Sequence, residues 1–201
     1  NQVNIERVDG NWVLANTGNF PVISENVTKF VEDLANIRTG RLVTNTSASH
    51  QRLEVDANNY QRKVDITTTN GTFTLFIGSS PAQSNVHVRI SGQDAVYLTN
   101  AISTTTASAL VSNWIDTSYI KIESANVKEI QVTTAKENLQ FQLNEAGEWN
   151  CLQLSANEKL DTSNWTTYLT AFTNLRMVSP VSNTIDESYG FSSPLAKLTI
   201  K

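Results

Sequence analysis

The sequence predicts an α+β fold in which antiparallel β-meander sheets have helices packed on one face. We expect a duplicated unit whose second copy is incomplete. Three observations support this prediction. Short alternating apolar segments, separated by turn residues, dominate the chain and are typical of antiparallel strands. Two longer segments have apolar residues at helical spacing. The stretch 5–43 also resembles the stretch 141–181 in order and spacing.

The two similar stretches share a turn signal followed by a helix signal. Gly10-x-Trp12 corresponds to Gly147-x-Trp149, and the helical segments that follow are shifted by one further residue. The matching apolar positions are Val27, Phe30, Val31 and Leu34 in the first copy, and Trp165, Tyr168, Leu169 and Phe172 in the second. A repeat of this length indicates tandem domains, so we place the first unit at 1–118 and the second, truncated copy at 119–201.

Each of the two helical segments has boundary signals. We expect helices at 25–38 and 163–176, and each of these segments ends in Asn-apolar-Arg. Ser24 and Thr162 are the predicted N-caps, because a hydroxyl oxygen there accepts from a free N–H of the first turn. A further helix is predicted at 103–114, where the apolar face would comprise Ala107, Leu110, Val111 and Trp114.

Alternating segments predict the strands. A hairpin is expected from Val3 to Leu14 with its turn at Asp9-Gly10, and Asn70-Gly71 is the strongest two-residue turn signal. Further strands of the first unit are expected at 42–43, 53–55, 64–66, 73–77, 86–90 and 95–98. In the second unit they are expected at 119–123, 128–133, 138–143, 148–154 and 195–200.

Composition limits the class of protein. The 201 residues carry a net charge of −4, and no basic cluster is present, which argues against nucleic acid as a partner. The chain is rich in Ser, Thr and Asn, as extracytoplasmic surfaces often are. No apolar run approaches the ~20 residues that span a bilayer. We expect a fragment of a longer protein, anchored by a segment outside it.

The residues that usually carry chemistry are few and scattered. His50 falls in a polar loop and His87 on the polar face of a predicted strand, and neither has a neighbouring carboxylate at ligand spacing. Cys151 alternates with Trp149 in a predicted strand, which favours a small core residue over a His-paired nucleophile. No phosphate-binding loop or nucleophile elbow is found. We therefore expect no catalytic site, no metal and no cofactor.

Three aromatic residues are candidates for a ligand or partner surface. They are Trp12, Trp149 and Tyr97. Exposed rings of this kind bind sugars or partner side chains, whereas the periodic position of each also suits a core role. The two interpretations differ in whether the rings are exposed.

Several segments together carry a family resemblance. They are Gly-Asn-Trp-Val-Leu at 10–14, the helix end 34–38, and the strand segments 53–56, 74–78, 86–89 and 96–98. In these segments the chain resembles the bacterial domain-of-unknown-function family 4340. The resemblance implies an α+β fold, tandem copies behind a membrane anchor, and genes beside ABC transporters of the gliding-motility type. It carries no catalytic residues.

Three hypotheses for the function follow. The first is a non-enzymatic extracytoplasmic interaction domain associated with an ABC-type transporter complex, with no direct membrane span in this stretch. The second is a ligand- or carbohydrate-binding domain with a cleft between the two units. The third is a hydrolase built around His50 or His87, which requires a Ser, Cys or acidic partner within hydrogen-bond reach.

Overall fold

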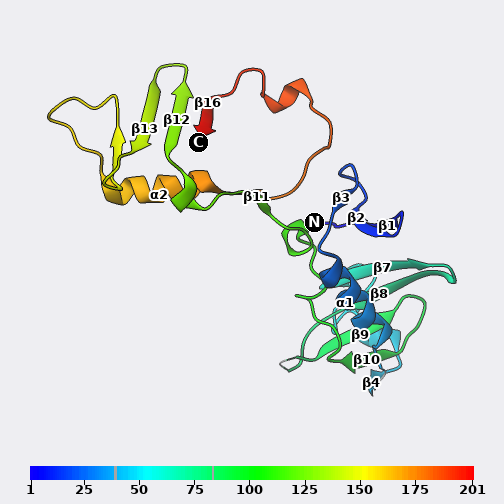
Figure 1. Cartoon of the computed structure of the whole chain (residues 1–201). Coiled ribbons are helices and arrows are strands. Elements are labelled where there is room, and N and C mark those ends of the chain that lie inside the picture. Colours follow the sequence, from blue (N-terminus) through cyan, green and yellow to red (C-terminus); the bar gives the residue numbers. More distant parts are fainter. Residues whose placement is uncertain (39, 83) are drawn as a thin grey trace. The chain divides into compact units, whose positions relative to one another are not determined.

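The chain forms two compact units, Asn1–Ile115 and Asp116–Lys201. The computed structural model describes residues 1–38, 40–82 and 84–201. Antiparallel sheets dominate both units, and the described residues of each unit form one α-helix (Figure 1). Antiparallel sheets with helices agree with the predicted α+β class. That the second unit is an incomplete copy of the first stays a prediction.

The first unit begins with a small three-stranded sheet. Its strands are β1 (Ile5–Val8), β2 (Asn11–Leu14) and β3 (Phe20–Pro21). Asp9 and Gly10 form the turn between β1 and β2 with φ of 48° and 85°. Left-handed backbone at both central residues matches the right-handed twist of a hairpin. The predicted hairpin and its turn are confirmed.

Helix α1 (Ser24–Ala35) follows and is held at its start by a distant carbonyl. The N-cap residue is Ile23, whose N–H donates to the Trp114 carbonyl at 2.7 Å. Ser24 is therefore the first helical residue, and its prediction as the N-cap is wrong. The helix also ends before the predicted Arg38.

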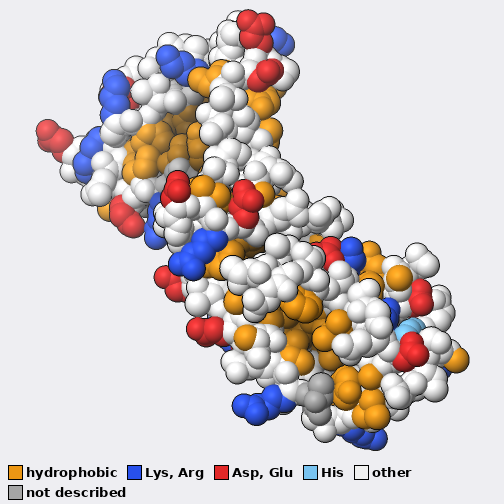
Figure 2. Space-filling view, turned by 90° about the vertical axis from the view of Figure 1, so that its right-hand side faces the viewer, with side chains coloured by type: hydrophobic (Ala, Val, Ile, Leu, Met, Phe, Trp, Pro, Cys, Tyr) orange, Lys and Arg blue, Asp and Glu red, His pale blue; other side chains and the backbone are white. Residues whose placement is uncertain are grey.

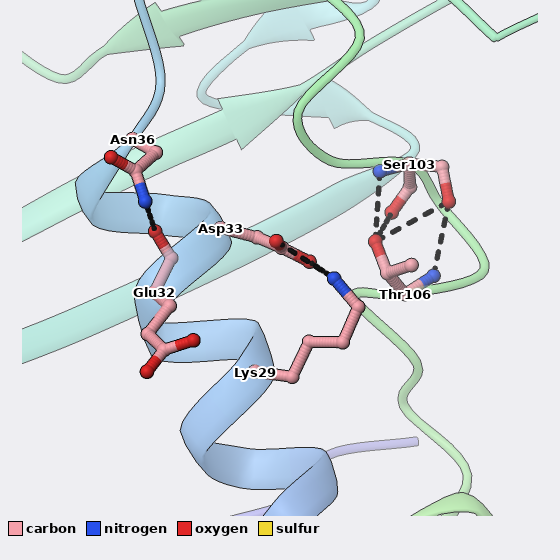
Figure 3. A network of polar contacts seen from close by, with 6 residues as sticks. All are labelled: Lys29, Glu32, Asp33, Asn36, Ser103 and Thr106. Atoms are coloured by element: carbon pink, nitrogen blue, oxygen red, sulfur yellow. Dashed lines mark hydrogen bonds and ion pairs between the residues drawn. The ribbon is translucent and has the colours of Figure 1, made fainter.

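Polar side chains stabilise the later turns of α1. Lys29 and Asp33 form an ion pair at 2.8 Å, one turn apart on the helix surface (Figure 3). The Asn36 side-chain amide donates to the Glu32 carbonyl at 2.9 Å, and the same carbonyl accepts the Asn36 backbone N–H at 2.9 Å. Asn36 thus ends the helix that the sequence extended to Arg38.

The main sheet of the first unit has five antiparallel strands in the order β4-β10-β9-β8-β7. They are β4 (Arg41–Thr44), β7 (Arg62–Thr68), β8 (Gly71–Ile77), β9 (Val86–Ile90) and β10 (Val96–Thr99). Thr68 pairs with Gly71, so Thr69 and Asn70 form the turn between β7 and β8. The turn lies one residue earlier than the predicted Asn70-Gly71.

Both faces of this sheet are covered. On one face, α1 contributes Phe30 and Leu34 to a core of Leu75, Ile77, Val86, Val88, Ile102 and Ala107. On the other face lie the short helix η1 (Ser47–Ser49) and a two-stranded sheet formed by β5 (Val55–Asp56) and β6 (Asn59–Tyr60). There Leu53 and Val55 pack against Phe76 and Val96. The sequence predicts the helical cover but misses this second layer, which we call the back layer (residues 47–60).

The back layer approaches the sheet so closely that one position requires glycine. A Cβ atom on Gly78 would lie 2.2 Å from the carbonyl oxygen of Leu53 and 2.7 Å from a side-chain carbon of Val55. Two hydrogen bonds support the same contact, since the Ser79 N–H and the Ser79 hydroxyl both donate to the Leu53 carbonyl. The backbone of β8 and the back layer are therefore in direct contact.

The predicted helix at 103–114 is absent. Only a 3-10 turn, η2 (Val111–Asn113), forms near its end. Ser103 and Thr106 exchange backbone-to-hydroxyl bonds of 2.9 and 3.1 Å and close a turn on each other (Figure 3). Hydroxyl side chains that bond to nearby backbone groups compete with helix formation. The periodic apolar residues of this segment are real, but Ala107 and Trp114 are buried from a loop.

The second unit contains two sheets and one helix. A four-stranded sheet has the order β14-β13-β12-β16, and β11 pairs with β15. The elements are β11 (Ser118–Lys121), η3 (Ser124–Asn126), β12 (Glu129–Thr134), β13 (Asn138–Leu143), β14 (Trp149–Cys151), α2 (Thr162–Thr173), β15 (Asn174–Arg176), η4 (Glu187–Tyr189) and β16 (Ala196–Ile200).

Helix α2 begins at a side-chain cap. The Asp161 carboxylate accepts from the backbone N–H groups of Ser163 and Asn164, so Asp161 and not the predicted Thr162 is the N-cap. The helix ends at Thr173, and the Asn-Leu-Arg segment that we expected to end it forms β15 instead.

Each helix buries three of its four predicted apolar positions at least partly. In α1, Val27 is buried and Phe30 and Leu34 face the core, whereas Val31 is 43% exposed. In α2, Trp165, Leu169 and Phe172 pack on Ile130, whereas Tyr168 is 58% exposed. The exposed position is i+4 in α1 but i+3 in α2. The helical prediction is confirmed, and the buried face differs between the helices.

Candidate functional site

An apolar groove lies on the first unit between the end of α1 and the main sheet. Its volume is about 330 Å³. The apolar lining comprises Leu34, Ile37, Ile66, Phe73, Leu75, Val88, Ile90, Ala95 and Tyr97. Two of these, Phe73 and Ile90, are 48% and 42% exposed although both are large and apolar. Hydrophobic side chains are visible on the surface of both units (Figure 2).

Unequal strand lengths create this groove. Strand β8 pairs with β7 over seven residues, from Ile77 to Gly71, but with β9 only from Leu75 to Ile77. The β7–β8 hairpin therefore projects beyond β9. Phe73 and Ile66 are cross-strand partners in this projecting part, and among the described residues no third strand lies beside Phe73. The sequence predicts Phe73 in a strand, and the projection of the hairpin is what exposes its side chain.

Polar groups are few at the groove. They come from Thr74, Arg89 and Gln93. The Arg89 guanidinium lies 4.7 Å from the Phe76 ring and donates to the carbonyls of Val55 (2.7 Å) and Gln93 (3.2 Å). Burial lowers the pKa of Arg89. Because its donors are directed at backbone carbonyls, Arg89 joins the back layer to the sheet, and the groove itself suits apolar side chains.

A serine and a histidine meet behind the sheet. His87 Nδ1 lies 3.1 Å from the Ser79 hydroxyl, which donates to the Leu53 carbonyl at 3.1 Å. A carbonyl only accepts, so this pattern makes His87 the donor to Ser79. A general base needs the opposite direction, with the hydroxyl donating to the imidazole. The pair meets the distance that the hydrolase hypothesis requires, but its hydrogen bonds are those of a structural contact.

The environment of both histidines is protein interior. Burial lowers the pKa of His87, with a smaller opposing effect from its Ser79 backbone hydrogen bond. His50 is buried, not in an open polar loop, and its Nε2 lies 2.9 Å from the Asp94 carbonyl. Across the described ranges, no three His, Cys, Asp or Glu residues are grouped to hold a metal ion.

A family comparison identifies the chain. The model described as Domain of unknown function (DUF4340) matches residues 12–194, which is most of both units. The chain belongs to this family. The family resemblance is thereby confirmed. No curated protein and no solved structure matches the chain.

The three candidate aromatic residues of this DUF4340 chain lie in different surroundings. Tyr97 is half-buried and lines the groove. Trp12 is half-buried in β2, with the Arg7 guanidinium 5.9 Å from its ring. Trp149 packs in the core of the second unit, 5.1 Å from the Trp165 ring. Only Tyr97 joins the groove, where its neighbours Phe73 and Ile90 were not candidates.

The single cysteine belongs to the second unit, whereas both histidines belong to the first. Cys151 is buried in β14 and pairs with Phe141 of β13. Its sulfur lies 3.5 Å from the Gln153 side-chain oxygen. In the part of the chain that the structure describes, no helix has the length and hydrophobicity needed to cross a membrane.

Proposed function

We propose that this DUF4340 chain is a non-enzymatic interaction domain that acts outside the cytoplasm as an accessory of an ABC-type transporter complex. The observation that carries the proposal is the groove on the first unit, where Phe73 and Ile90 are about half exposed. Large apolar side chains gathered on a surface and rimmed by polar residues are typical of interaction sites.

The chemistry of the groove supports binding over catalysis. Its lining is mostly aliphatic and aromatic, and its charged member, Arg89, already has carbonyl partners. On the opposite face of the sheet, the Ser79 hydroxyl donates to Leu53 of the back layer and lies next to the His87 ring. A partner that inserts apolar side chains into the groove would remove Phe73 and Ile90 from water, which is favourable in proportion to the apolar area covered.

The cellular context in this proposal comes from the family resemblance. It implies tandem copies, an N-terminal membrane anchor and genes beside gliding-motility-type ABC transporters. The Ser-, Thr- and Asn-rich composition supports an extracytoplasmic location. A membrane-embedded permease or one of its extracytoplasmic companions is therefore the partner class that we propose.

Site-specific cross-linking tests this proposal. A photoreactive phenylalanine analogue replaces Phe73 in the anchored, full-length protein, and cells that make the protein naturally are irradiated. The matched control replaces Tyr60, which is 42% exposed and contacts Phe76 on the back face of the same sheet. We expect a cross-link from position 73, but not from position 60, to a permease or its companion. Equal labelling from both positions, or none from position 73, would contradict the proposal.

The groove also favours a second candidate function, the binding of a small ligand. Its volume of about 330 Å³ lies at the lower end of ligand pockets, and Tyr97 supplies an aromatic wall with a hydroxyl. This groove lies within the first unit, whereas the sequence-based hypothesis placed the ligand between the units. Native mass spectrometry of the purified protein tests it. A bound mass that is lost on replacing Tyr97 and Phe73 by alanine would favour the ligand over the protein partner.

A further inference from the structure

Two strands in different units have the same local pattern. Lys63-Val64-Asp65-Ile66 lies in β7, and Lys197-Leu198-Thr199-Ile200 lies in β16. Upstream of each strand, at or after the end of a short 3-10 helix, lies a turn that contains an apolar residue, a left-handed residue and a second apolar residue. In the first unit η1 ends at Ser49, and β6 lies between this turn and β7. These are Leu53-Glu54-Val55 with φ of 58° at Glu54, and Tyr189-Gly190-Phe191 with φ of 73° at Gly190. The spacing from this turn to the strand differs by two residues between the units.

The two strands also place the same residue beside a helix. Ile66 of β7 lines the groove with Leu34 and Ile37 from the end of α1. Ile200 of β16 packs on the cluster that contains Trp165 of α2. Because side chains alternate along a strand, Val64 and Leu198 share these faces. The correspondence therefore covers sequence and side-chain direction.

Backbone hydrogen bonds show which residues of β7 face its free edge. Strand β8 lies between β7 and β9. It bonds to β9 through the Thr74 carbonyl, which accepts from the Ser91 N–H at 2.9 Å, and through the Gly78 N–H, which donates to the His87 carbonyl at 2.8 Å. Successive residues of an antiparallel strand direct their N–H and C=O groups to opposite sides, so the intervening β8 residues bond to β7. The β7 residues whose backbone groups then face outward are Lys63, Asp65 and Thr67.

In β16 the corresponding row of backbone groups is already paired. Lys201 and Glu129 exchange two bonds of 2.9 and 3.1 Å. By the same alternation, Lys197 and Thr199 also direct their backbone groups toward β12. These residues correspond to the outward row of β7. The edge that binds β12 in the second unit is thus the edge that has no strand beside it in the described part of the first unit.

The β1–β2 hairpin of the first unit and the β13–β14 hairpin of the second show the same difference between a free and a paired edge. Asn4 and Ala15 bond across the β1–β2 hairpin at 3.0 Å, so the alternate residue Ile5 faces the outer edge of β1. In the second unit, Leu143 of β13 bonds to Lys128 at 3.0 Å, and Phe141 therefore faces β12 in the same way. Strand β12 is thus bound on both sides, by β13 and β16, whereas β1 and β7 each have one edge that pairs with no strand of the described residues.

We propose that the first unit is a β-strand acceptor, in which the free edge of β7 binds an extended antiparallel segment with the apolar–polar alternation of β12. The inference rests on the proposed function, because it specifies the partner as an extended polypeptide. In the second unit, Ile130 lies opposite Ile200 and Val132 lies opposite Leu198. By correspondence, the partner segment places one apolar residue beside Ile66, at the side of the groove, and a second beside Val64.

The edge of β7 suits an extended partner, because it presents neither an unmatched charge nor a bulky side chain that would oppose strand pairing. Lys63 and Asp65 form an ion pair at 2.9 Å on the face away from the groove, so their charges are matched before a partner arrives. Thr67 presents only a hydroxyl, which lies 3.4 Å from that of Thr72. Main-chain bonds supply affinity in strand addition, and the alternate apolar side chains supply specificity.

A synthetic peptide tests the proposal with the complete 201-residue chain. The probe is an end-blocked, fluorescent peptide with the sequence of residues 127–134, and binding is measured by fluorescence anisotropy. We expect saturable binding that protects the amides of Lys63, Asp65 and Thr67 from hydrogen exchange. A peptide with aspartate in place of Ile130 and Val132 should not bind. Absence of saturation, or protection confined to the second unit, would overturn the proposal.

N-methylated peptides identify the edge that binds. Methylation of the Gln131 nitrogen removes a donor from the side that faces the strand equivalent to β7, and methylation of Val132 removes one from the opposite side. We expect the Gln131 change to weaken binding by about tenfold or more, since it removes one main-chain bond and adds a clash at the strand edge. Weakening only by the Val132 change would overturn the assignment to β7.

A chain variant supplies the reciprocal test. Thr67→Pro removes an outward N–H of β7 while leaving the bonds to β8 in place, because proline is tolerated where the N–H faces solvent. Its binding should fall by about tenfold, whereas Tyr60→Ala on the back face should bind normally. If the peptide fails to bind but position 73 still cross-links to a permease, strand addition is wrong and the interaction function stands. If the peptide binds but position 73 gives no cross-link, strand addition stands and the proposed interaction with a transporter complex is wrong.

Discussion

The two units differ in how completely their sheets are covered. In the first unit, α1 covers one face of the main sheet and the back layer covers the other. In the second unit, α2 covers one face, while the opposite face has the alternate residues Gln131, Gln140 and Gln142. The same kind of sheet-and-helix contact thus occurs with and without a second layer. The difference shows that one helix with one apolar sheet face is enough to build a core.

The back layer also changes the state of similar residues. Leu53 and Val55 flank the left-handed Glu54 and are buried between this layer and the sheet, whereas Phe191, which follows the left-handed Gly190 of the second unit, is exposed. The segment that connects β15 to β16 contains further large exposed side chains, which are Val178, Val181, Ile185 and Leu195. Stability in the first unit should therefore depend on the back layer, and stability in the second unit on α2 alone.

The largest effect is expected where the back layer touches the sheet. Gly78→Ala places a methyl group against the backbone of Leu53 and Glu54, which cannot move without displacing the layer. We expect a loss of about 3 kcal/mol in the free energy of unfolding of the first unit. Urea unfolding followed by hydrogen exchange with mass spectrometry measures it for each unit. Gly40→Ala is the control, since its Cβ would meet nothing within 4 Å. Equal losses for both variants would contradict the close contact.

A pair of substitutions in α2 tests which face holds the second unit together. Leu169→Ala removes a side chain that packs on the Ile130 cluster, so we expect a loss of about 2 kcal/mol. Tyr168→Ala removes a mostly exposed ring and should change stability by about 0.5 kcal/mol or less. Thermal and urea unfolding of the two variants gives the comparison. A larger loss for Tyr168→Ala would show that the helix is rotated relative to this description.

The helix starts provide a smaller contrast. Asp161→Ala removes the carboxylate that accepts two N–H groups of α2, and we expect a loss of about 1 kcal/mol in the second unit. Ser24→Ala should have little effect on the first unit, because α1 has no side-chain cap. Amide exchange in the first turn of each helix measures both. If Ser24→Ala costs as much as Asp161→Ala, the serine caps α1 after all.

The smallest expected effect is a pH dependence confined to the first unit. The pKa of His87 is lowered from its ordinary 6.5 by burial. The unfolded chain therefore binds a proton more readily than the native chain as the pH falls below about 6.5. Stability is full above this value and decreases toward pH 5.5, by less than about 1 kcal/mol. His87→Gln should reduce this slope in urea unfolding, and the second unit, which has no histidine, is the internal control.

The sequence predicts elements well where one local signal determines them. The Asp9-Gly10 hairpin and the apolar faces of both helices were predicted because turn chemistry and helical period are local properties. The prediction of a helix at 103–114 was wrong because the hydroxyls of Ser103 and Thr106 accept from each other's backbone N–H groups. These hydrogen bonds compete with helix formation but leave the apolar period of the sequence unchanged. Strand length matters as well, since nothing local shows that β8 projects beyond β9.

The candidate site was largely invisible for the same reason. Tyr97 was a predicted candidate, whereas Phe73 and Ile90 were predicted only as strand residues. Phe73 lies beyond the part of β8 that pairs with β9, and Ile90 lies beyond the part of β9 that pairs with β10, which exposes both side chains. The back layer was read as a strand at 53–55, yet the left-handed Glu54 turns this segment across the sheet. Tertiary contacts therefore decided both the groove and the layer behind it.

The link between Trp114 and the start of α1 has a consequence for synthesis on the ribosome. The Ile23 N–H needs the Trp114 carbonyl, and the Asn26 side chain donates to Asn113, 87 residues later. The Phe30 ring also meets the Trp114 ring edge-on at 5.4 Å. A contact between such distant residues is slow to form and requires both ends of the unit. While the chain emerges from the exit tunnel, the first helix must therefore wait for nearly the whole unit before its start is fixed.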